Sequence, residues 1–194
     1  TLHKTLNFLK KKKINNVIIE CSSHGLDQKR LHHINFKGAV FTNFSQDHLD
    51  YHKNMRAYLN AKLILFREIL KKRSLVISDK EIQQFSLLKK ISKNKNLKIT
   101  DISKDIEKIK TLLSRYNCDF KLKNLAMAIN SIRLCGLKEK LIYKAILKVK
   151  DVNGRLELAR KYPNGIKVFI DYAHTPDALL QILKSLRSDY GNEI

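Results

Sequence analysis

The 194-residue sequence contains no tryptophan, only two prolines, six glycines and three cysteines. Cys21, Cys118 and Cys135 are odd in number and show no C-x-x-C spacing, which excludes a zinc ribbon and a disulfide scaffold. No apolar run approaches the 18 or more residues of a membrane-spanning helix, and no secretory signal is recognisable. We therefore expect a reduced, cytoplasmic protein that does not insert into a membrane.

Two motifs of nucleotide and acyl chemistry are missing as well. None of the six glycines lies in G-x-x-x-x-G-K-[ST], so this chain carries no loop of that type to hold phosphates. The G-x-S-x-G turn of serine hydrolases is also missing, and adjacent Ser and His side chains cannot easily form a triad. Ser22, Ser23 and His24 therefore do not favour a hydrolase.

Acidic residues are scarce relative to basic ones, because 18 Asp and Glu stand against 39 Lys and Arg, a formal net charge of +21. An excess of this size raises nucleic acid or an anionic membrane as a partner. However, 30 of the basic residues are Lys, spread from Lys4 to Lys184, whereas a nucleic-acid surface more often clusters Arg. We interpret the charge as a compositional bias, expect no specific nucleic acid, and keep a basic nucleic-acid-binding module as the alternative function.

Hydrophobic periodicity predicts an α/β fold with a mostly parallel sheet. Short apolar runs predict buried strands at Val17–Ile19, Ala39–Thr42, Leu75–Ile77, Leu97–Thr100 and Val168–Ile170. Helical spacing predicts helices at Leu2–Lys13, Met55–Leu70, Ile102–Leu113, Leu122–Leu134, Lys138–Val149 and Ala178–Leu186. The last strand and helix form an incomplete βα unit, which predicts the beginning of a second domain.

Polar residues follow three of these strands directly, at the place where open α/β sheets bind ligands. Glu20 follows the first strand, and a carboxylate there must be solvated, paired or metal-bound; taken alone, a salt bridge with a Lys is the simpler interpretation. His48 and His52 could share one helical face and hold a transition metal, which leaves a metal-dependent hydrolase as a third option. Asp171 follows the last strand.

Five segments occur together in an order that is similar to one enzyme family. They are ECSSHGLDQKR at 20–30, FTNFSQDHLDYH at 41–52, AYLNAKLILF at 57–66, GRLE at 154–157 and DYAHTPDAL at 171–179. In this order the chain resembles the Mur ligases, and among them the members that add the third residue of the peptidoglycan stem peptide.

The resemblance implies an ATP-dependent ligase that joins meso-diaminopimelate or L-lysine to UDP-N-acetylmuramoyl-L-alanyl-D-glutamate through an acyl phosphate, with ATP and Mg²⁺ required. It implies that residues 1–152 are most of a central ATPase-type domain, P-loop-NTPase-like in fold. Residues 153–194 would be the first βα unit of a Rossmann-like C-terminal domain. We expect a monomer.

The resemblance also implies roles for nine residues. It places Glu20 and His48 around Mg²⁺, with Lys62, carbamylated by CO2, holding a second Mg²⁺. Residues matching those that hold the UDP-muramoyl dipeptide are Ser22, Gln28 and Arg30, and those matching nucleotide-contacting positions are Asn124, Arg155 and Asp171.

The sequence also departs from the family pattern. Cys118 stands where the family carries Gly, and Lys121 replaces the first Asn ahead of Asn124, at the corner that would hold adenine. Asn153 stands where a Pro often precedes the G-R pair. The chain begins at Thr1 and carries no phosphate loop, so we expect a ligase core cut at both ends that has no ligase activity on its own.

Overall fold

The computed structural model describes residues 1–113 and 118–191, and these form two compact units. Unit 1 comprises Thr1–Phe44 and His48–Asp101, and unit 2 comprises Ser45–Asp47 and Ile102–Ile194. The predicted boundary at residue 152 between two domains stays a prediction.

Unit 1 is an α/β layer built on a short parallel sheet. Its elements in chain order are α1 (Leu2–Lys11), α2 (Ser23–Asp27), β1 (Gly38–Phe41), α3 (Leu49–His52), α4 (Met55–Ile64), the π-helical turn η1 (Leu65–Ile69), β2 (Leu75–Ser78), α5 (Phe85–Lys95) and β3 (Lys98–Asp101). The strands lie in the order β1-β2-β3 and are all parallel, with Val40 opposite Ile77 and Ile77 opposite Thr100. This confirms the α/β class and the parallel sheet.

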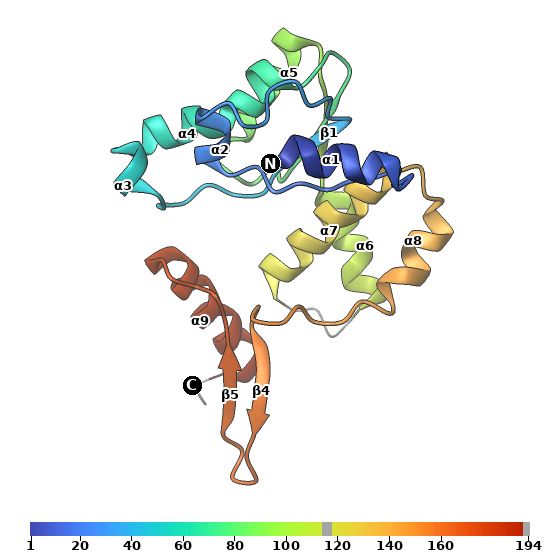
Figure 1. Cartoon of the computed structure of the whole chain (residues 1–194). Coiled ribbons are helices and arrows are strands. Elements are labelled where there is room, and N and C mark those ends of the chain that lie inside the picture. Colours follow the sequence, from blue (N-terminus) through green and yellow to red (C-terminus); the bar gives the residue numbers. More distant parts are fainter. Residues whose placement is uncertain (114–117, 192–194) are drawn as a thin grey trace. The chain divides into compact units, whose positions relative to one another are not determined.

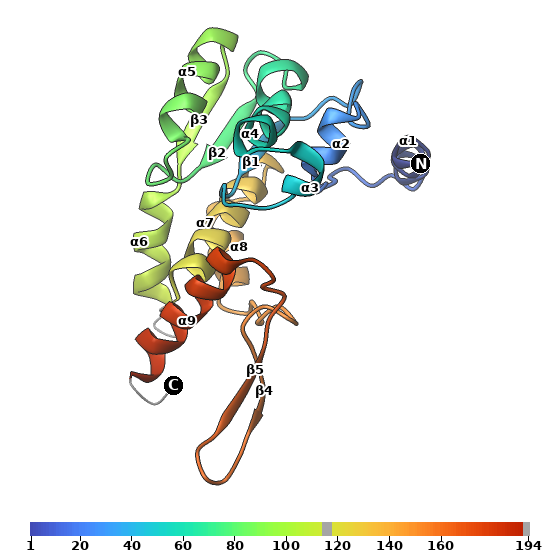
Figure 2. The same cartoon turned by 90° about the vertical axis from the view of Figure 1, so that its left-hand side faces the viewer.

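The core of unit 1 explains why these strands form. Val76 and Ile77 on the central strand are fully buried, as expected when helices cover both faces of a parallel sheet. Leu63 of α4 and Phe66 of η1 join this core, together with Leu88 of α5. Figure 2 shows the three strands side by side, with α5 next to β3. The predicted helix Met55–Leu70 is therefore confirmed, with its last turn widened into η1.

The predicted buried strand Val17–Ile19 is wrong. The segment has no strand hydrogen bonds, and Val17 and Ile18 are 44% and 82% exposed. An apolar, β-branched run indicates only a preference for burial, whereas a strand also needs a neighbour that completes its backbone hydrogen bonds. Among the described residues β1 is an edge strand that pairs only with β2, and the segment does not pair with its other edge.

Unit 2 consists of helices followed by a hairpin and a further helix. Its elements are α6 (Ser103–Leu112), α7 (Asp119–Leu134), α8 (Glu139–Ile146), β4 (Glu157–Lys161), β5 (Lys167–Ile170) and α9 (Pro176–Tyr190). Apolar side chains such as Ile109, Leu122, Ile129 and Ile142 are almost completely buried, which confirms the amphipathic pattern predicted for the first three helices. Thr175 caps α9 through a hydrogen bond from the backbone N–H of Ala178.

A polar network joins α6, α7 and α8 inside unit 2. The Arg133 guanidinium donates to both carboxylate oxygens of Asp105 at 2.7 Å and also to Glu139. Asn130 and Tyr143 donate further hydrogen bonds to Asp105, which is 8% exposed. A buried carboxylate is tolerated because its acceptor sites are satisfied in this way.

The strand predicted at Val168–Ile170 exists as β5, but the prediction that it is buried is wrong. Val168 and Ile170 are 41% and 51% exposed. The strand pairs antiparallel with β4, which the sequence pattern did not indicate, and the pair forms a hairpin (Figure 1). A two-stranded ribbon has only one neighbour for each strand, so it cannot enclose its own side chains.

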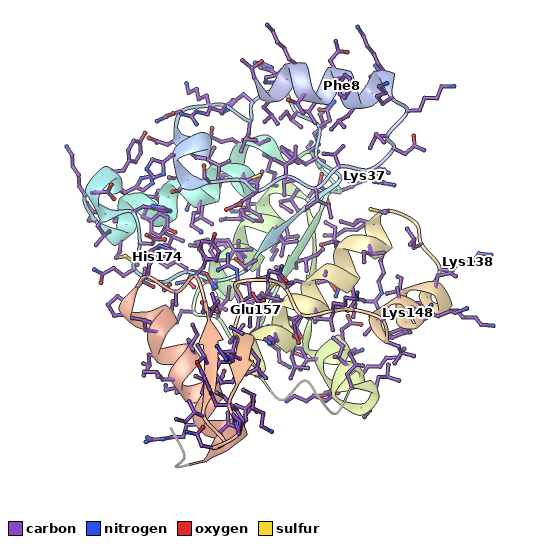
Figure 3. All side chains as sticks on the ribbon, turned by 60° about the horizontal axis from the view of Figure 1, so that its bottom comes forward. Phe8, Lys37, Lys138, Lys148, Glu157 and His174 are labelled. Atoms are coloured by element: carbon purple, nitrogen blue, oxygen red, sulfur yellow. The ribbon has the colours of Figure 1, made fainter. Side chains whose placement is uncertain are left out.

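Basic side chains occur on both units. Lys37 precedes β1 of unit 1, while Lys138 and Lys148 flank α8 of unit 2, and all three are exposed (Figure 3). No helix among the described residues is long and apolar enough to cross a membrane.

Candidate functional site

The candidate site of unit 1 is built by the segments that follow β1 and by the two helices packed beside them. The loop after Phe41, the last residue of β1, leads to His48 and α3. Open α/β sheets bind ligands at this carboxyl end of their strands. His48 is the residue before α3 and adopts a left-handed backbone conformation with φ of 52°. Helix α4 packs on both α2 and α3, as Figure 1 shows. The sequence motifs 20–30, 41–52 and 57–66 thereby become neighbours in space.

The three predicted dipeptide-binding residues lie together on α2 and the turn that follows it. Ser22 caps α2 by accepting a hydrogen bond from the Gly25 N–H at 3.1 Å. Gln28 ends the helix, and its side-chain amide donates to the Tyr51 hydroxyl at 3.3 Å. Arg30 is exposed immediately after this turn. Their shared location agrees with a single binding surface, although Ser22 also has a local capping role.

A cluster of aromatic rings connects α2 with α3. The ring of His24 lies 4.9 Å from that of His48, 4.1 Å from that of Tyr51 and 5.4 Å from that of His52, measured between centroids. Tyr51 donates its hydroxyl hydrogen to Asp27 of α2 at 2.9 Å. Three imidazoles therefore meet here, those of His48 and His52, which the sequence singled out, and that of His24.

His52 has a structural partner. Its side chain is buried, and its Nε2 lies 2.9 Å from the Oγ of Ser23. Burial lowers the pKa of His52, and the neighbouring rings of His24 and His48 lower it further, against the opposing charges of Asp27 and Asp50. The contact with Ser23 engages the Nε2 of His52, so only its Nδ1 would remain for the metal pair of His48 and His52 considered for a hydrolase. Within the described ranges, no three His, Cys, Asp or Glu side chains gather as a metal site.

Lys62 lies on α4, half-buried, one turn after Tyr58. Its Nζ donates to the Tyr58 hydroxyl at 3.3 Å and lies 5.1 Å from the centroid of the Tyr58 ring. The same ring is 5.8 Å from the ring of His48 in an edge-to-face arrangement. The structure thus brings two of the three predicted metal-site residues, His48 and Lys62, to one tyrosine.

Glu20 is placed differently. It is exposed at the end of the extended segment before α2, and it makes no hydrogen bond or ion pair with any described residue. The negative charge of Glu20 acts on the neighbouring Cys21. Burial raises the pKa of the Cys21 thiol, and the Glu20 charge raises it further to a smaller extent. The carboxylate oxygens are therefore available to a ligand.

The three residues predicted to hold Mg²⁺ offer different donors. Mg²⁺ prefers oxygen ligands, keeps several waters and is usually held by one or two carboxylates together with substrate phosphates. Glu20 offers an exposed carboxylate, whereas His48 offers an imidazole and Lys62 a half-buried amine. The set fits Mg²⁺ through Glu20 and through the carbamate predicted at Lys62, since that carbamate would replace the amine with oxygen donors.

In unit 2, Arg155 and Asp171 lie at one junction between the GRLE and DYAH segments. Asp171 accepts hydrogen bonds from the backbone N–H groups of Leu156 at 2.6 Å and Ala173 at 2.7 Å. The Arg155 guanidinium lies 5.2 Å from the centroid of the Tyr172 ring. Asp171 therefore organises the loop that carries Arg155, a role that the sequence did not indicate.

Asn124 stands apart from this junction, exposed on α7, and no hydrogen bond between described residues connects it to Arg155 or Asp171. The two departures near it have structural explanations. Cys118 precedes α7 with φ of −74°, a conformation open to any residue, and its sulfur lies 3.2 Å from the Ser185 hydroxyl. Lys121 forms an ion pair with Asp151 at 3.2 Å.

Sequence reasoning missed Tyr58 and the pairing of His52 with Ser23. A signal for Tyr58 existed, because a residue four positions before Lys62 lies on the same face of a helix. No comparable signal existed for Ser23 and His52, which are 29 positions apart and meet only through the packing of α2 against α3 and α4.

Comparison with known proteins gives consistent matches. The family description "Mur ligase middle domain" matches residues 1–138. A protein of Rickettsia bellii (strain RML369-C) named UDP-N-acetylmuramoyl-L-alanyl-D-glutamate--2,6-diaminopimelate ligase is 35% identical over 209 residues, covering 97% of this chain and 43% of the relative. A protein of the same name from Wigglesworthia glossinidia brevipalpis is 34% identical, covering 98% and 43%.

A solved structure of a protein with this name also matches, with a TM-score of 0.61 and 26% identity over 87% of this chain and 39% of the other. The chain thus spans about two fifths of the length of the curated relatives it matches. The family match over residues 1–138 includes the segments that build the candidate site of unit 1.

Proposed function

The chain belongs to the Mur ligase family, and on this premise we propose that it supplies the central part of an ATP-dependent ligase of peptidoglycan precursor synthesis. The reaction joins an amine of 2,6-diaminopimelate to a carboxylate of the terminal D-glutamate of UDP-N-acetylmuramoyl-L-alanyl-D-glutamate. The diamino acid is the one in the names of the matched relatives. The observation that carries the proposal is the meeting of His48 and Lys62 at Tyr58, beside the α2 surface.

The chemistry explains why these residue types are needed. A carboxylate is a poor electrophile, so it is first phosphorylated by ATP, and the amine then displaces phosphate from the acyl phosphate. Phosphoryl transfer depends mainly on positioning and on stabilising negative charge on the transferring oxygens. Mg²⁺ held by Glu20, His48 and carbamylated Lys62 would supply that charge stabilisation.

Lys62 can serve this purpose only after modification. The neutral amine adds CO2 and releases a proton, which converts a cation into a carbamate anion with two oxygen donors. Lys62 lies half-buried against the hydroxyl and ring of Tyr58, and only its uncharged amine can add CO2. An unmodified ammonium group would instead repel Mg²⁺.

The remaining residues would bind the two large substrates. Arg30, with Ser22 and Gln28 on the same turn, would pair with a phosphate or carboxylate of the UDP-muramoyl dipeptide. Arg155 and Asn124 would contact the nucleotide, and Asp171 would hold the Arg155 loop while accepting from the ribose. We further propose that the protein works in the cytoplasm as a monomer.

Binding of the dipeptide substrate tests this function on the chain itself. Isothermal titration with UDP-N-acetylmuramoyl-L-alanyl-D-glutamate should show saturable binding that Arg30→Ala weakens by about 10-fold or more, on the scale of a lost charged hydrogen bond. Arg160→Ala is the matched control, because Arg160 is equally exposed but lies on β4 of unit 2. Equal losses in both variants would mean that the ligand senses only net charge, and the proposal would fail.

A further inference from the structure

Tyr58 occupies a central position in the candidate site. It is 5% exposed on α4, one helical turn before Lys62. Its hydroxyl oxygen accepts a hydrogen bond from the Lys62 Nζ at 3.3 Å, and that amine also lies 5.1 Å from the ring centroid. The tyrosine therefore contacts the amine in two ways, through its polar group and through its aromatic face.

The ring of Tyr58 is itself fixed by three neighbours from other segments. Phe44 packs at 5.1 Å and 35°, His52 stacks at 5.3 Å and 28°, and His48 meets it edge-on at 5.8 Å and 86°. Rings at these distances and angles are mutually attractive, and each neighbour removes a direction in which Tyr58 could turn.

The stack is anchored at its far end. His52 is buried and its Nε2 lies 2.9 Å from the Ser23 Oγ on α2. A continuous series of contacts therefore runs from Ser23 through His52 and Tyr58 to Lys62, linking α2, α3 and α4. At one end the series reaches α2, which Gln28 caps. At the other end it reaches Lys62 on α4.

We propose that Tyr58 is a positioning residue that holds the Lys62 side chain and the His48 ring in the arrangement needed for the ligase site. Its ring places His48, and its hydroxyl places the Lys62 nitrogen, so that modification and metal binding occur at one fixed point. This inference rests on the proposed function, because it concerns how that site is held. Phe at this position would retain the ring contacts and lose the hydroxyl contact.

The two roles are separable by substitution in the full chain. Tyr58→Phe removes the hydroxyl alone, whereas Tyr58→Leu also removes the ring. Tyr162→Phe is the matched control, since it removes a hydroxyl from an exposed tyrosine of unit 2. Lys62→Arg identifies the NMR signals of Lys62.

Two NMR readouts distinguish positioning from a merely structural role. With 13C-labelled lysine, the ε-carbon of Lys62 should be ordered in the unmodified chain and in Tyr162→Phe, and mobile in Tyr58→Phe. Under 13CO2, the carbamate population on Lys62 should fall about fivefold in Tyr58→Phe, the factor expected for loss of one hydrogen bond that the hydroxyl would donate to the carbamate. The melting temperature of Tyr58→Phe should stay close to that of Tyr162→Phe, while Tyr58→Leu should unfold earlier and broaden the His48 ring signals.

The outcomes separate this inference from the proposed function. Ordered and fully carbamylated Lys62 in Tyr58→Phe would overturn the positioning role. If Lys62 is released by Tyr58→Phe but no carbamate forms on it in any variant, the positioning contact is supported and the carbamate site of the proposed function fails. A stability loss in Tyr58→Phe with unchanged Lys62 order would show that Tyr58 only contributes to the core.

Discussion

Single residues in this protein combine local and functional roles. Ser22 both caps α2 and lies on the proposed dipeptide surface, and Asp171 holds two backbone N–H groups beside Arg155. A side chain fixed by a local hydrogen bond loses less conformational freedom when a ligand arrives. Substitutions at these positions are therefore expected to affect stability and binding together, whereas exposed Glu20 should affect binding alone.

Asp105 gives a prediction at the residue scale. Burial alone would raise its pKa, but hydrogen bonds from Arg133 and Asn130, the Arg133 charge and a hydrogen bond from Tyr143 outweigh burial and lower it. Glu139 and Lys108 are the other charged groups beside this network. A lowered pKa in the folded state stabilises the protein above the ordinary pKa, and this contribution is lost as pH falls through the folded value.

Asp105→Asn should therefore lower the stability of the protein at pH 7 by about 1–3 kcal/mol, and the difference should shrink as the pH falls from about 5 to about 3. Thermal unfolding measured as a function of pH would show this. Asp119→Asn is the control, because that carboxylate is 69% exposed and its ion pair with Lys123 lies on the surface of one helix. A pH-independent difference between Asp105→Asn and the parent chain would contradict this assignment.

Helices and strands were predicted correctly where the hydrophobic periodicity of the sequence matches the residues that the structure buries. Ala39, Val76 and Ile77 lie in short apolar runs that the sheet buries, so β1 and β2 were predictable, and the long spacing around Leu63 predicted α4. Helix α5 was not predicted, because its run of Lys masks a narrow apolar face. The strand predicted at Val17–Ile19 is wrong, because a strand forms only where it pairs with a neighbouring strand, and a local sequence pattern does not specify that pairing.

The sequence motifs predict which residues form the candidate site, but not how those residues are arranged. His48 and Lys62 could be assigned from motifs, yet nothing in the sequence specified that both would contact Tyr58. Ring packing between α2, α3 and α4 is a tertiary property, and residues 29 positions apart show no shared periodicity. The sequence also did not predict that the helix widens into the π-helical turn η1, which begins only three residues after Lys62.

The GRLE turn gives a prediction at the element scale. Gly136 and Gly154 both have positive φ, at 82° and 69°, so Ala strains the backbone at either position by about 1 kcal/mol. A Cβ at Gly154 would also lie 2.9 Å from the Tyr172 ring, whereas nothing lies within 4 Å at Gly136. Gly154→Ala should therefore cost about 1 kcal/mol more than Gly136→Ala, the low end for overpacking, because Tyr172 is 70% exposed and its ring can shift. Thermal unfolding of the two variants tests this, and equal melting temperatures would contradict the packing of Tyr172 on this turn.

At the scale of the whole molecule, net charge and family membership point to different binding partners, polyanions in the first case and ligase substrates in the second. The formal net charge is +21, but the chain belongs to a family matched over residues 1–138 by its middle domain, and its basic side chains occur on both units. Net charge of this kind attracts polyanions without specificity.

We therefore predict weak, non-selective binding to DNA and RNA that disappears as salt rises, because the affinity comes from counterion release. Fluorescence anisotropy with two unrelated duplexes and one single strand, measured from low salt to about 200 mM, covers the relevant range. Similar affinities that fall together are expected. Selective binding that persists at the highest salt would favour the nucleic-acid-binding module over the ligase.

We propose a ligase site around carbamylated Lys62, and 13C NMR of the chain under 13CO2 detects this carbamate. We expect a carbamate resonance that disappears in Lys62→Arg and remains in Lys95→Arg, a control at another half-buried lysine on α5. Addition of Mg²⁺ should shift or strengthen that resonance, and Glu20→Gln should abolish the effect of Mg²⁺ without changing the melting temperature. A spectrum in which Lys62→Arg changes no carbamate signal would show that Lys62 is not carbamylated.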